Sequence, residues 1–498
     1  PQTSEAQPFE DAMRWTVEEV ARALAVRPPG GLDPLARLAG VSINSRTLAR
    51  GELFVAIHGP RHDGHDFVVA ALDAGALAGV VAEGRLAGFA EPYRSKLYAV
   101  PDTLHALQGL ARAVRTRWGR RLAAVTGSAG KTTTKEILAA LLAARFRVLK
   151  SEGNLNNEYG LPLQLLRLEE TDDAAVVELG MSHAGELKRL AEIARPDVGV
   201  VTRVAPVHLE FFASVDEIAL AKRELVEGLV GRESVAVLNA DDSRVTRFAE
   251  VAPGRVVTFG ISERADFRAE KIEDRGLQGT EFDFVAGGSR TRLNLPLAGR
   301  HNISNALAAL AAASVWGIGA AEAKEVFPKL EATGMRGRVL QYGAGFTVIN
   351  DCYNSNPVAL VAMVGLLANT PASGRHILAA GEMLELGPTS AELHREAGRA
   401  AASVGKLDWI IGVQGHADNF VRGAVDAGHP SARAKFFASS AEAGAFIENL
   451  LERGDVALVK GSRGVKMERI VEALDARFAR ADAEHAAPVA SGAPKERG

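Results

Sequence analysis

Cysteine is nearly absent from this sequence, since Cys352 is the single example among 498 residues. One cysteine excludes an intramolecular disulfide and any zinc site made of several cysteines. So little cysteine is typical of proteins from a reducing compartment, and we expect this chain to work in the cytoplasm.

An excess of either charge is also missing. The chain has 58 Lys and Arg against 61 Asp and Glu, which gives a formal net charge of −3. No basic tract is long enough to form a nucleic-acid surface, so we expect no nucleic-acid partner. Acidic or neutral small molecules are the ligands that this composition favours.

Long apolar runs are absent as well. The longest stretch without a charged residue, residues 302–321, is mostly alanine with Asn, Ser and Gly between, so we expect no membrane insertion. The residues before Trp15 carry no signal-peptide pattern. Residues 480–498 are rich in Ala, Pro, Gly and charge without an apolar period, and we expect them to form a disordered tail.

What the chain does contain is a repeated alternation of strands and helices. At 498 residues it is too long for one hydrophobic core, and we expect three domains of the α/β class. Residues 1–100 predict a small α/β domain, with strands at 53–57 and 79–82 and a helix at 67–74.

The rest of the chain predicts two larger sheets. Residues 101–333 predict a mostly parallel sheet of the P-loop ATPase type with helices on both faces, and residues 334–479 predict a Rossmann-like open sheet. The segment ATGMRGR, residues 332–338, is the expected hinge between them. Strands are expected at 174–179, 198–204 and 234–238 in the first sheet, and at 346–349, 376–380, 409–413 and 456–459 in the second.

Residues 121–136, RLAAVTGSAGKTTTKE, have the order of a strand, a phosphate loop and a helix. Glycines permit a tight loop with inward N–H groups, Lys131 can reach the outer phosphates, and Thr132 can hold Mg²⁺. Val125 stands where the usual pattern has its first glycine, so the loop is a shortened variant. A glycine-rich turn before an ordinary helix is the alternative. The residues expected to bind ATP here are Gly127, Ser128, Ala129, Gly130, Lys131, Thr132 and Thr133.

Two polar residues follow the next strands of the central part. Glu178 ends the apolar run AAVVE, where a carboxylate can bind Mg²⁺ directly or through water, or can be a solvated strand end. His208 follows the next strand in VAPVHLEFF and is either a structural histidine or a metal ligand.

Lys222 lies within the apolar stripe of a predicted helix. Ser214 and Glu217 form the pattern of a capping box, and Ile218 and Leu225 lie on the same stripe as Lys222. Burial of an ammonium lowers its pKa and leaves a nucleophilic amine, whereas a stem that reaches the solvent keeps the charge.

The order of the motifs resembles that of the Mur ligases. After TGSAGKTTTK come NLNNEYGLP, ELG, VHLE, ALAKREL, NADD, GRHNISNALAA, DCYNSNP, GEMLELG and VKGSRG, over residues 15–475. Mur ligases are ATP-dependent amide ligases that build the peptide stem of the peptidoglycan precursor. DCYNSNP and GEMLELG are similar to the member of the family that adds D-alanyl-D-alanine to UDP-N-acetylmuramoyl-tripeptide, and the DNPR signature of the tripeptide-forming ligase is absent.

This resemblance implies an ADP-forming ligase that makes an acyl phosphate and acts as a monomer on those two substrates. Another amide ligase of the superfamily, tripeptide-forming or polyglutamylating, stays open as an alternative, as does a non-catalytic nucleotide switch. The resemblance also implies two Mg²⁺ ions. Thr132 and Glu178 would hold the first, and His208 with a carbamylated Lys222 would hold the second.

The remaining site residues are implied by the resemblance alone. Asn302 and Asn305 fall where the family contacts adenine and neighbouring atoms of the nucleotide. Both could also cap an alanine-rich helix, and capping and binding can coexist. Arg338 matches an arginine that reaches the γ-phosphate, and Asp351 ends a strand that faces the nucleotide. The implied catalytic residues are therefore Lys131, Lys222, Arg338 and Asp351.

The two other substrates have implied sites as well. The expected UDP-binding residues are Ser45, Arg46 and Thr47, and the expected dipeptide-binding residues are Tyr353, Asn354 and Asn356. Three residues depart from the pattern of the family. An aspartate is commoner at the positions of Asn44 and Glu382, and an acidic residue is usual at the position of Asn350.

Overall fold

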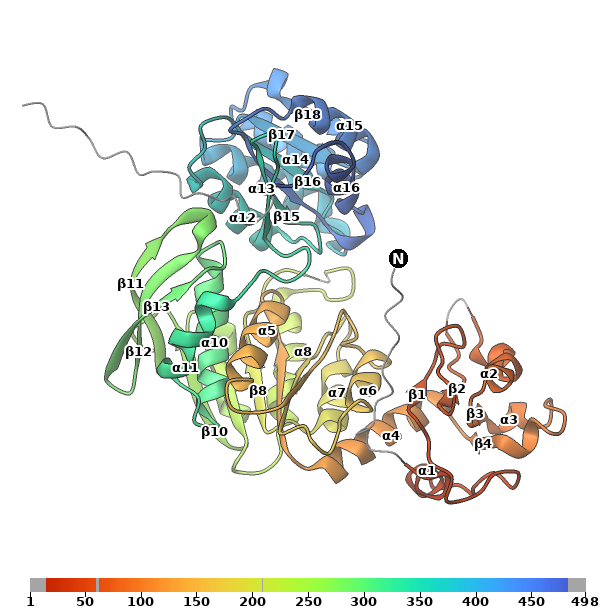
Figure 1. The fold of residues 1–498 in the computed structure, drawn as a ribbon. Helices are drawn as coiled ribbons and strands as arrows, with labels where there is room; N and C mark the ends of the chain where they lie inside the picture. Colours follow the sequence, from red (N-terminus) through yellow and green to blue (C-terminus); the bar gives the residue numbers. More distant parts are fainter. Residues whose placement is uncertain (1–14, 60–61, 208, 482–498) are drawn as a thin grey trace, which may run out of the picture.

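The computed structural model describes residues 15–59, 62–207 and 209–481. Within them the chain forms three separate sheets flanked by helices, so the predicted α/β class is confirmed. The central sheet lies between the other two (Figure 1). No helix in these ranges combines the length and the apolar character that a membrane crossing needs.

The N-terminal sheet is small and fully parallel, with the order β1-β2-β3-β4. The predicted helix at 67–74 is α2, which follows a 3-10 turn at Gly64–Phe67. Apolar side chains pack on both faces of the sheet, one group with α1 and the other with α2. The elements are α1 Val17–Leu24, β1 Val41–Ser42, β2 Leu53–Val55, α2 Val68–Asp73, β3 Ala78–Ala82, α3 Glu83–Leu86 and β4 Leu97–Val100.

The central sheet has nine strands in the order β13-β12-β11-β10-β9-β8-β5-β7-β6. It is parallel from β6 to β11, and β12 and β13 are antiparallel additions at one edge. Its strands are β5 Arg121–Thr126, β6 Val148–Lys150, β7 Ala174–Glu178, β8 Val198–Val201, β9 Val235–Asn239, β10 Arg255–Gly260, β11 Phe267–Asp274, β12 Thr280–Ala286 and β13 Ser289–Leu295.

Helices cover both faces of this sheet. The alanine-rich α10 is buried beside α5 on one face, whereas α4, α6, α7 and α8 contribute to the core on the other. Side chains near the start of α4 belong to the N-terminal core and those near its end to the central core, so α4 joins the two. The helices are α4 Thr103–Trp118, α5 Lys131–Leu142, α6 Gly160–Leu165, α7 Glu186–Ala194, α8 Val215–Glu227, α9 Ser243–Thr246, α10 His301–Ser314 and α11 Ala320–Val326.

The C-terminal sheet has the order β14-β15-β19-β16-β17-β18, with β14 antiparallel at the edge. Cores on its two faces include α12 and α13 on one side and α15 and α16 on the other. The elements are β14 Arg338–Gln341, β15 Thr347–Asp351, α12 Pro357–Asn369, β16 His376–Gly381, α13 Ser390–Ser403, β17 Trp409–Val413, α14 Ala417–Asp426, β18 Ala434–Phe437, α15 Ser440–Leu450, β19 Val456–Lys460 and α16 Glu468–Arg477.

The segment predicted as a hinge joins the two larger sheets just before β14. Gly334 and Gly337 adopt φ angles of +60° and +71° there, and residues with a Cβ atom rarely adopt such positive φ angles. At the far end of the C-terminal part, Arg480 forms a β-bridge with Tyr342 and an ion pair with Asp475. The remainder of the predicted tail, residues 482–498, lies outside the described residues.

Candidate active site

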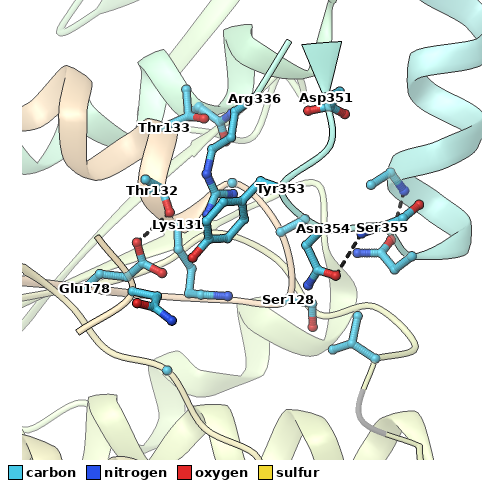
Figure 2. Close-up of a pocket in the computed structure, with 18 of the residues that line it drawn as sticks. Ser128, Lys131, Thr132, Thr133, Glu178, Arg336, Asp351, Tyr353, Asn354 and Ser355 are labelled. Carbon is cyan, nitrogen blue, oxygen red and sulfur yellow. Dashed lines mark hydrogen bonds between the residues drawn. The ribbon is translucent and has the colours of Figure 1, made fainter. Parts of the chain in front are cut away.

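A cavity of about 620 Å³ lies between the carboxyl edge of the central sheet and the C-terminal sheet. The phosphate loop and the segment after β15 face each other across it (Figure 2). Most of the predicted site residues line this cavity. Those that do not are Gly127, Lys222, Arg338, Ser45, Arg46 and Thr47, and His208 lies outside the described residues.

The phosphate loop takes the predicted form of strand, loop and helix, with α5 beginning at Lys131. Gly127 and Gly130 have φ angles of +149° and +85°. A Cβ atom on Gly127 would overlap the hydroxyl of Thr202, and one on Gly130 would overlap the amide oxygen of Asn305. Glycine is therefore required at both positions by backbone conformation and by space.

Ser128 lines the cavity, but its hydroxyl forms hydrogen bonds within the protein. It accepts a hydrogen bond from the Ala205 N–H at 2.9 Å and donates one to the Ala205 carbonyl at 3.1 Å. Thr202 donates to the Ala129 carbonyl at 2.6 Å. These bonds hold the phosphate loop against the segment that follows β8.

Lys131 directs its ammonium back onto the loop and donates to the Gly127 carbonyl at 2.9 Å. Burial lowers the pKa of this ammonium, Glu178 opposes that effect, and the guanidinium of Arg336 adds to it. Two cations thus lie close together in the cavity. Such an arrangement favours a strongly anionic ligand.

Glu178 forms an oxygen pair with Thr132 at the end of β7. The Thr132 hydroxyl donates to its carboxylate at 2.6 Å, and the Asn156 amide donates to the other carboxylate oxygen at 2.9 Å. Glu178 is only 4 % exposed, so the alternative of a solvated strand end is wrong. A hydroxyl beside a carboxylate is the kind of hard oxygen set that Mg²⁺ prefers.

Lys222 is buried in α8, with 2 % of its surface exposed, so the alternative of a stem that reaches the solvent is wrong. Burial lowers the pKa of its ammonium well below the usual value, and the charge of Lys131 lowers it further. In the described ranges no carboxylate forms an ion pair with it. Both effects favour the neutral, nucleophilic amine over the ammonium.

The second predicted metal site stays a prediction. In the described part of the chain, no group of three or more His, Cys, Asp and Glu side chains could hold a metal ion. Lys222 as an ammonium is no ligand, and it would become one only as a carbamate. The start of α8 also differs from the expected capping box, because Glu217 accepts from the Ala213 N–H and not from Ser214.

Asn302 and Asn305 lie in α10 beyond its first residue, so the alternative that they cap this helix is wrong. Asn302 donates to the Ala298 carbonyl at 2.9 Å and accepts from Asn305 at 2.9 Å. Both line the cavity next to the phosphate loop. The linked amides can present polar groups to the adenine side of a nucleotide.

The structure brings Arg336 into the cavity and leaves Arg338 outside it. The guanidinium of Arg336 lies 3.8 Å from the centre of the Tyr353 ring, and Figure 2 shows this pair beside Lys131. Arg338 is exposed, begins β14 and pairs in register with Asn350. The geometry therefore does not support the prediction for Arg338. The two arginines flank Gly337, and the sequence contains nothing that tells which of them turns inward.

Lys460 is a site residue that the sequence analysis missed. Its ammonium donates to the Asp351 carboxylate at 2.7 Å and to the Asn354 carbonyl at 2.9 Å. The sequence did contain a signal for Lys460, because this lysine ends an apolar strand within VKGSRG, one of the motifs that carry the resemblance.

The predicted dipeptide residues all line the cavity but differ in what they do. Asn356 is the N-cap of α12 and accepts from the Ala359 N–H at 2.9 Å, so its side chain is committed to the helix. The Asn354 side chain accepts from Ser355 at 2.8 Å. Tyr353 lies against Arg336, beside Lys131 of the phosphate loop (Figure 2).

The predicted UDP residues lie in the turn after β1, apart from this cavity. The Asn44 side chain accepts from the Arg46 N–H at 3.1 Å, so the departure at Asn44 keeps a turn-forming acceptor. Glu382 points to the loop after β17 and accepts from the His416 N–H at 2.9 Å. Asn350 accepts from the Cys352 N–H at 3.3 Å.

Comparison with known families agrees with this architecture. Three family models match: "Mur ligase family, catalytic domain" over residues 37–115, "Mur ligase middle domain" over residues 125–313 and "Mur ligase, glutamate ligase domain" over residues 335–463. Together they span the phosphate loop, the N-terminal sheet and nearly all of the two sheets that border the cavity.

Similar proteins and structures cover nearly the whole chain. The UDP-N-acetylmuramoyl-tripeptide--D-alanyl-D-alanine ligase of Bacillus subtilis is 34% identical over 87% of this chain and 93% of its own length. The ligase of the same name from Escherichia coli is 36% identical over 88% and 94%. The crystal structure of MurF from Acinetobacter baumannii has a TM-score of 0.84 at 28% identity, covering 93% of this chain and 99% of its own. MurF ligase from Thermotoga maritima in complex with ADP has a TM-score of 0.76 at 29% identity, covering 88% and 97%.

Proposed function

Because this chain belongs to the Mur ligase family, we propose that it uses ATP to join D-alanyl-D-alanine to UDP-N-acetylmuramoyl-tripeptide, releasing ADP and phosphate. One structural observation carries the proposal. The phosphate loop and the carboxyl edge of a second sheet line the same cavity, so a triphosphate and an amine substrate can meet there. The product is the UDP-muramoyl-pentapeptide used in peptidoglycan synthesis.

The first step is phosphoryl transfer to the tripeptide. Its terminal carboxylate attacks the γ-phosphorus of ATP, the bond to the bridging oxygen breaks, and an acyl phosphate and ADP result. Lys131 and Arg336 are the cations placed to stabilise the charge that spreads over the phosphoryl oxygens.

Magnesium fits the oxygen pair at the end of β7. Thr132 and Glu178 would hold one ion, and a bound ion neutralises charge on the phosphate oxygens. A second ion would need Lys222 as a carbamate, together with His208. The lowered pKa of the buried Lys222 supports this idea, because it favours the neutral amine, which is the form of lysine that reacts with CO₂.

The second step is amide formation. The amine of the dipeptide attacks the acyl carbon, loses a proton, and expels phosphate from the tetrahedral intermediate. Water must be excluded, since it would hydrolyse the acyl phosphate. Gly334 and Gly337, both with positive φ angles, are suited to let the C-terminal sheet close on the cavity.

We place this reaction in the cytoplasm and assign it to a monomer. The composition, with a single cysteine, suits a reducing compartment. Residues of the central and C-terminal sheets of the same chain line the cavity, which supports the assignment to a monomer.

The proposal is tested by measuring ADP formation with both substrates and with each omitted in turn. We expect ADP release only when ATP, UDP-N-acetylmuramoyl-tripeptide and D-alanyl-D-alanine are all present, and a pentapeptide product by mass spectrometry. ADP release stimulated by another amino acid would identify a different amide ligase. Tight ATP binding without turnover would identify a nucleotide switch.

The contrast between Arg336 and Arg338 gives a direct test of the site geometry. Replacing Arg336 with alanine should lower kcat by roughly thirtyfold, because a cation that contacts the transferring phosphoryl group is removed. Arg338→Ala should change kcat by less than about twofold, because this side chain is exposed on β14. Steady-state kinetics of the two variants decide between them, and a loss confined to Arg338→Ala would restore the sequence-based prediction.

A further inference from the structure

Lys460 carries a buried positive charge at the point where the C-terminal sheet meets the cavity. It ends β19, and only 3 % of its surface is exposed. A buried ammonium must be paired, and here the structure provides a carboxylate and a carbonyl, at 2.7 and 2.9 Å. The pairing therefore restrains both partners as well as the lysine.

The two partners belong to different parts of the proposed site. Asp351 ends β15 and faces the proposed nucleotide position, whereas Asn354 lies in the segment proposed to receive the dipeptide. Asp351 and Lys460 are also register neighbours on adjacent parallel strands. One ammonium thus bridges a group assigned to ATP and a group assigned to the second substrate.

The chain beyond Lys460 extends this connection. The Ser462 hydroxyl donates to the Ser355 carbonyl at 3.4 Å and accepts from the Leu384 N–H at 2.9 Å. A Cβ atom on Gly461 would lie 3.0 Å from the Cα of Gly381, so the backbones are in close contact there. Movement of the segment around Asn354 would therefore disturb Lys460 and its neighbours as a unit.

We propose that Lys460 is a positioning residue that couples the two substrates, so that nucleotide bound beside Asp351 orders the dipeptide site through the Asn354 carbonyl. This inference rests on the proposed function, because it uses the nucleotide and dipeptide assignments. Its ligands are a nucleoside triphosphate and a D,D-dipeptide. The role is one of coupling, since Lys460 acts through Asp351 and Asn354.

The experiment measures dipeptide affinity by calorimetry with and without a saturating non-hydrolysable ATP analogue. In the wild-type protein we expect the analogue to tighten dipeptide binding roughly tenfold. We call the ratio of dipeptide affinities with and without the analogue the coupling ratio. In Lys460→Met, which keeps the volume and removes the charge, the coupling ratio should fall below about twofold. The KM for dipeptide at saturating ATP should rise by roughly tenfold, while the KM for UDP-N-acetylmuramoyl-tripeptide should stay within about twofold.

Arg375→Met is the matched control. Arg375 binds the buried Asp455 carboxylate at 2.7 Å and the Leu450 carbonyl at 2.6 Å, at the opposite edge of the same sheet. Its loss should lower the unfolding midpoint and leave the coupling ratio unchanged. If the coupling ratio falls in Arg375→Met as far as it falls in Lys460→Met, the decrease reflects general destabilisation and the proposal is wrong.

Asp351→Asn is a second test of the proposal if Lys460→Met does not fold. It keeps the shape of the side chain and weakens one of the two hydrogen bonds of Lys460, so it should also reduce the coupling ratio to below about twofold. A wild-type ratio of one, or a variant that keeps the wild-type ratio, would overturn the inference. Failure of the proposed function is distinguishable, because wild-type protein would then release no ADP on addition of dipeptide.

Discussion

Replacing Lys131 with alanine should lower ADP formation by roughly a thousandfold. The ammonium of Lys131 is partly buried at the cavity, 2.9 Å from the Gly127 carbonyl, and it can turn to a phosphate oxygen when ATP binds. Charge that develops on the phosphoryl group would lose a nearby cation that is already in place before the reaction. The measurement is the initial rate of ADP release with all three substrates at saturation.

Two variants make this result specific to the loop. Lys131→Arg keeps the charge but changes the donor geometry, so it should recover only part of the activity. Lys188→Ala removes an exposed lysine of α7 and should leave the rate within about twofold of the wild type. Undiminished turnover in Lys131→Ala would show that the phosphate loop does not hold the reacting nucleotide.

Replacing Lys222 with methionine should have opposite effects on activity and on stability. The proposed metal ligand is lost, so activity should fall on the order of a thousandfold. Burial lowers the pKa of this ammonium in the folded protein, so the folded protein binds the proton less tightly than the unfolded chain, whose pKa is about 10.4. Below that pH the difference opposes folding, and methionine removes it. In buffer free of CO₂ at pH 7, we expect Lys222→Met to be more stable by about 1 to 4 kcal/mol.

The pH dependence follows from the same shift. Between the lowered pKa of Lys222 in the folded state and about 10.4, the unfolded chain binds more protons, so the stability of the wild type rises with pH relative to Lys222→Met. Urea unfolding at several pH values measures the free energy of unfolding of the wild type and of Lys222→Met. Groups that titrate in the same way in both proteins cancel in the difference between them. A constant difference over that range would show that Lys222 is not held neutral.

Bicarbonate adds an independent readout. Carbamylation of Lys222 should raise both the activity and the thermal midpoint of the wild type when bicarbonate is added to protein prepared without CO₂, and Lys222→Met should respond to neither. Lys135→Met is the matched control, because Lys135 is equally buried but donates to the Ser151 carbonyl at 2.5 Å and pairs with Glu136. That variant should lose stability. Full activity in Lys222→Met would refute the carbamate.

Much of the candidate site was predictable because its signals are local. A phosphate loop needs glycines, a lysine and a threonine within a few residues, and the backbone of Gly127–Thr132 takes that form. The alternation of strands and helices likewise placed each of the strands that it predicted to within three residues, because apolar periodicity is a property of short segments. The lysine in the apolar stripe of α8 was visible for the same reason.

The features that the sequence missed or left undecided depend on contacts between distant segments. Asn302 and Asn305 were assigned to the nucleotide with a capping role left open, and only the start of α10 at His301 and the contact of Asn305 with Gly130 decide against capping. Arg336 and Arg338 are equivalent in a segment rich in glycine, and only the start of β14 decides which of them faces Tyr353. Lys460 gains its role from Asp351, more than a hundred residues earlier in the chain.

The sequence by itself determined the α/β class, the phosphate loop, the resemblance to Mur ligases and a lysine that burial would keep neutral. Each of these follows from residue types at short spacing, where backbone conformation and apolar period leave few alternatives. The tertiary structure decided which side chains share the cavity, which arginine enters it, and which carboxylate Lys460 holds. Those outcomes depend on the order of strands within the two sheets and on how the sheets face each other, and neither is contained in a local pattern.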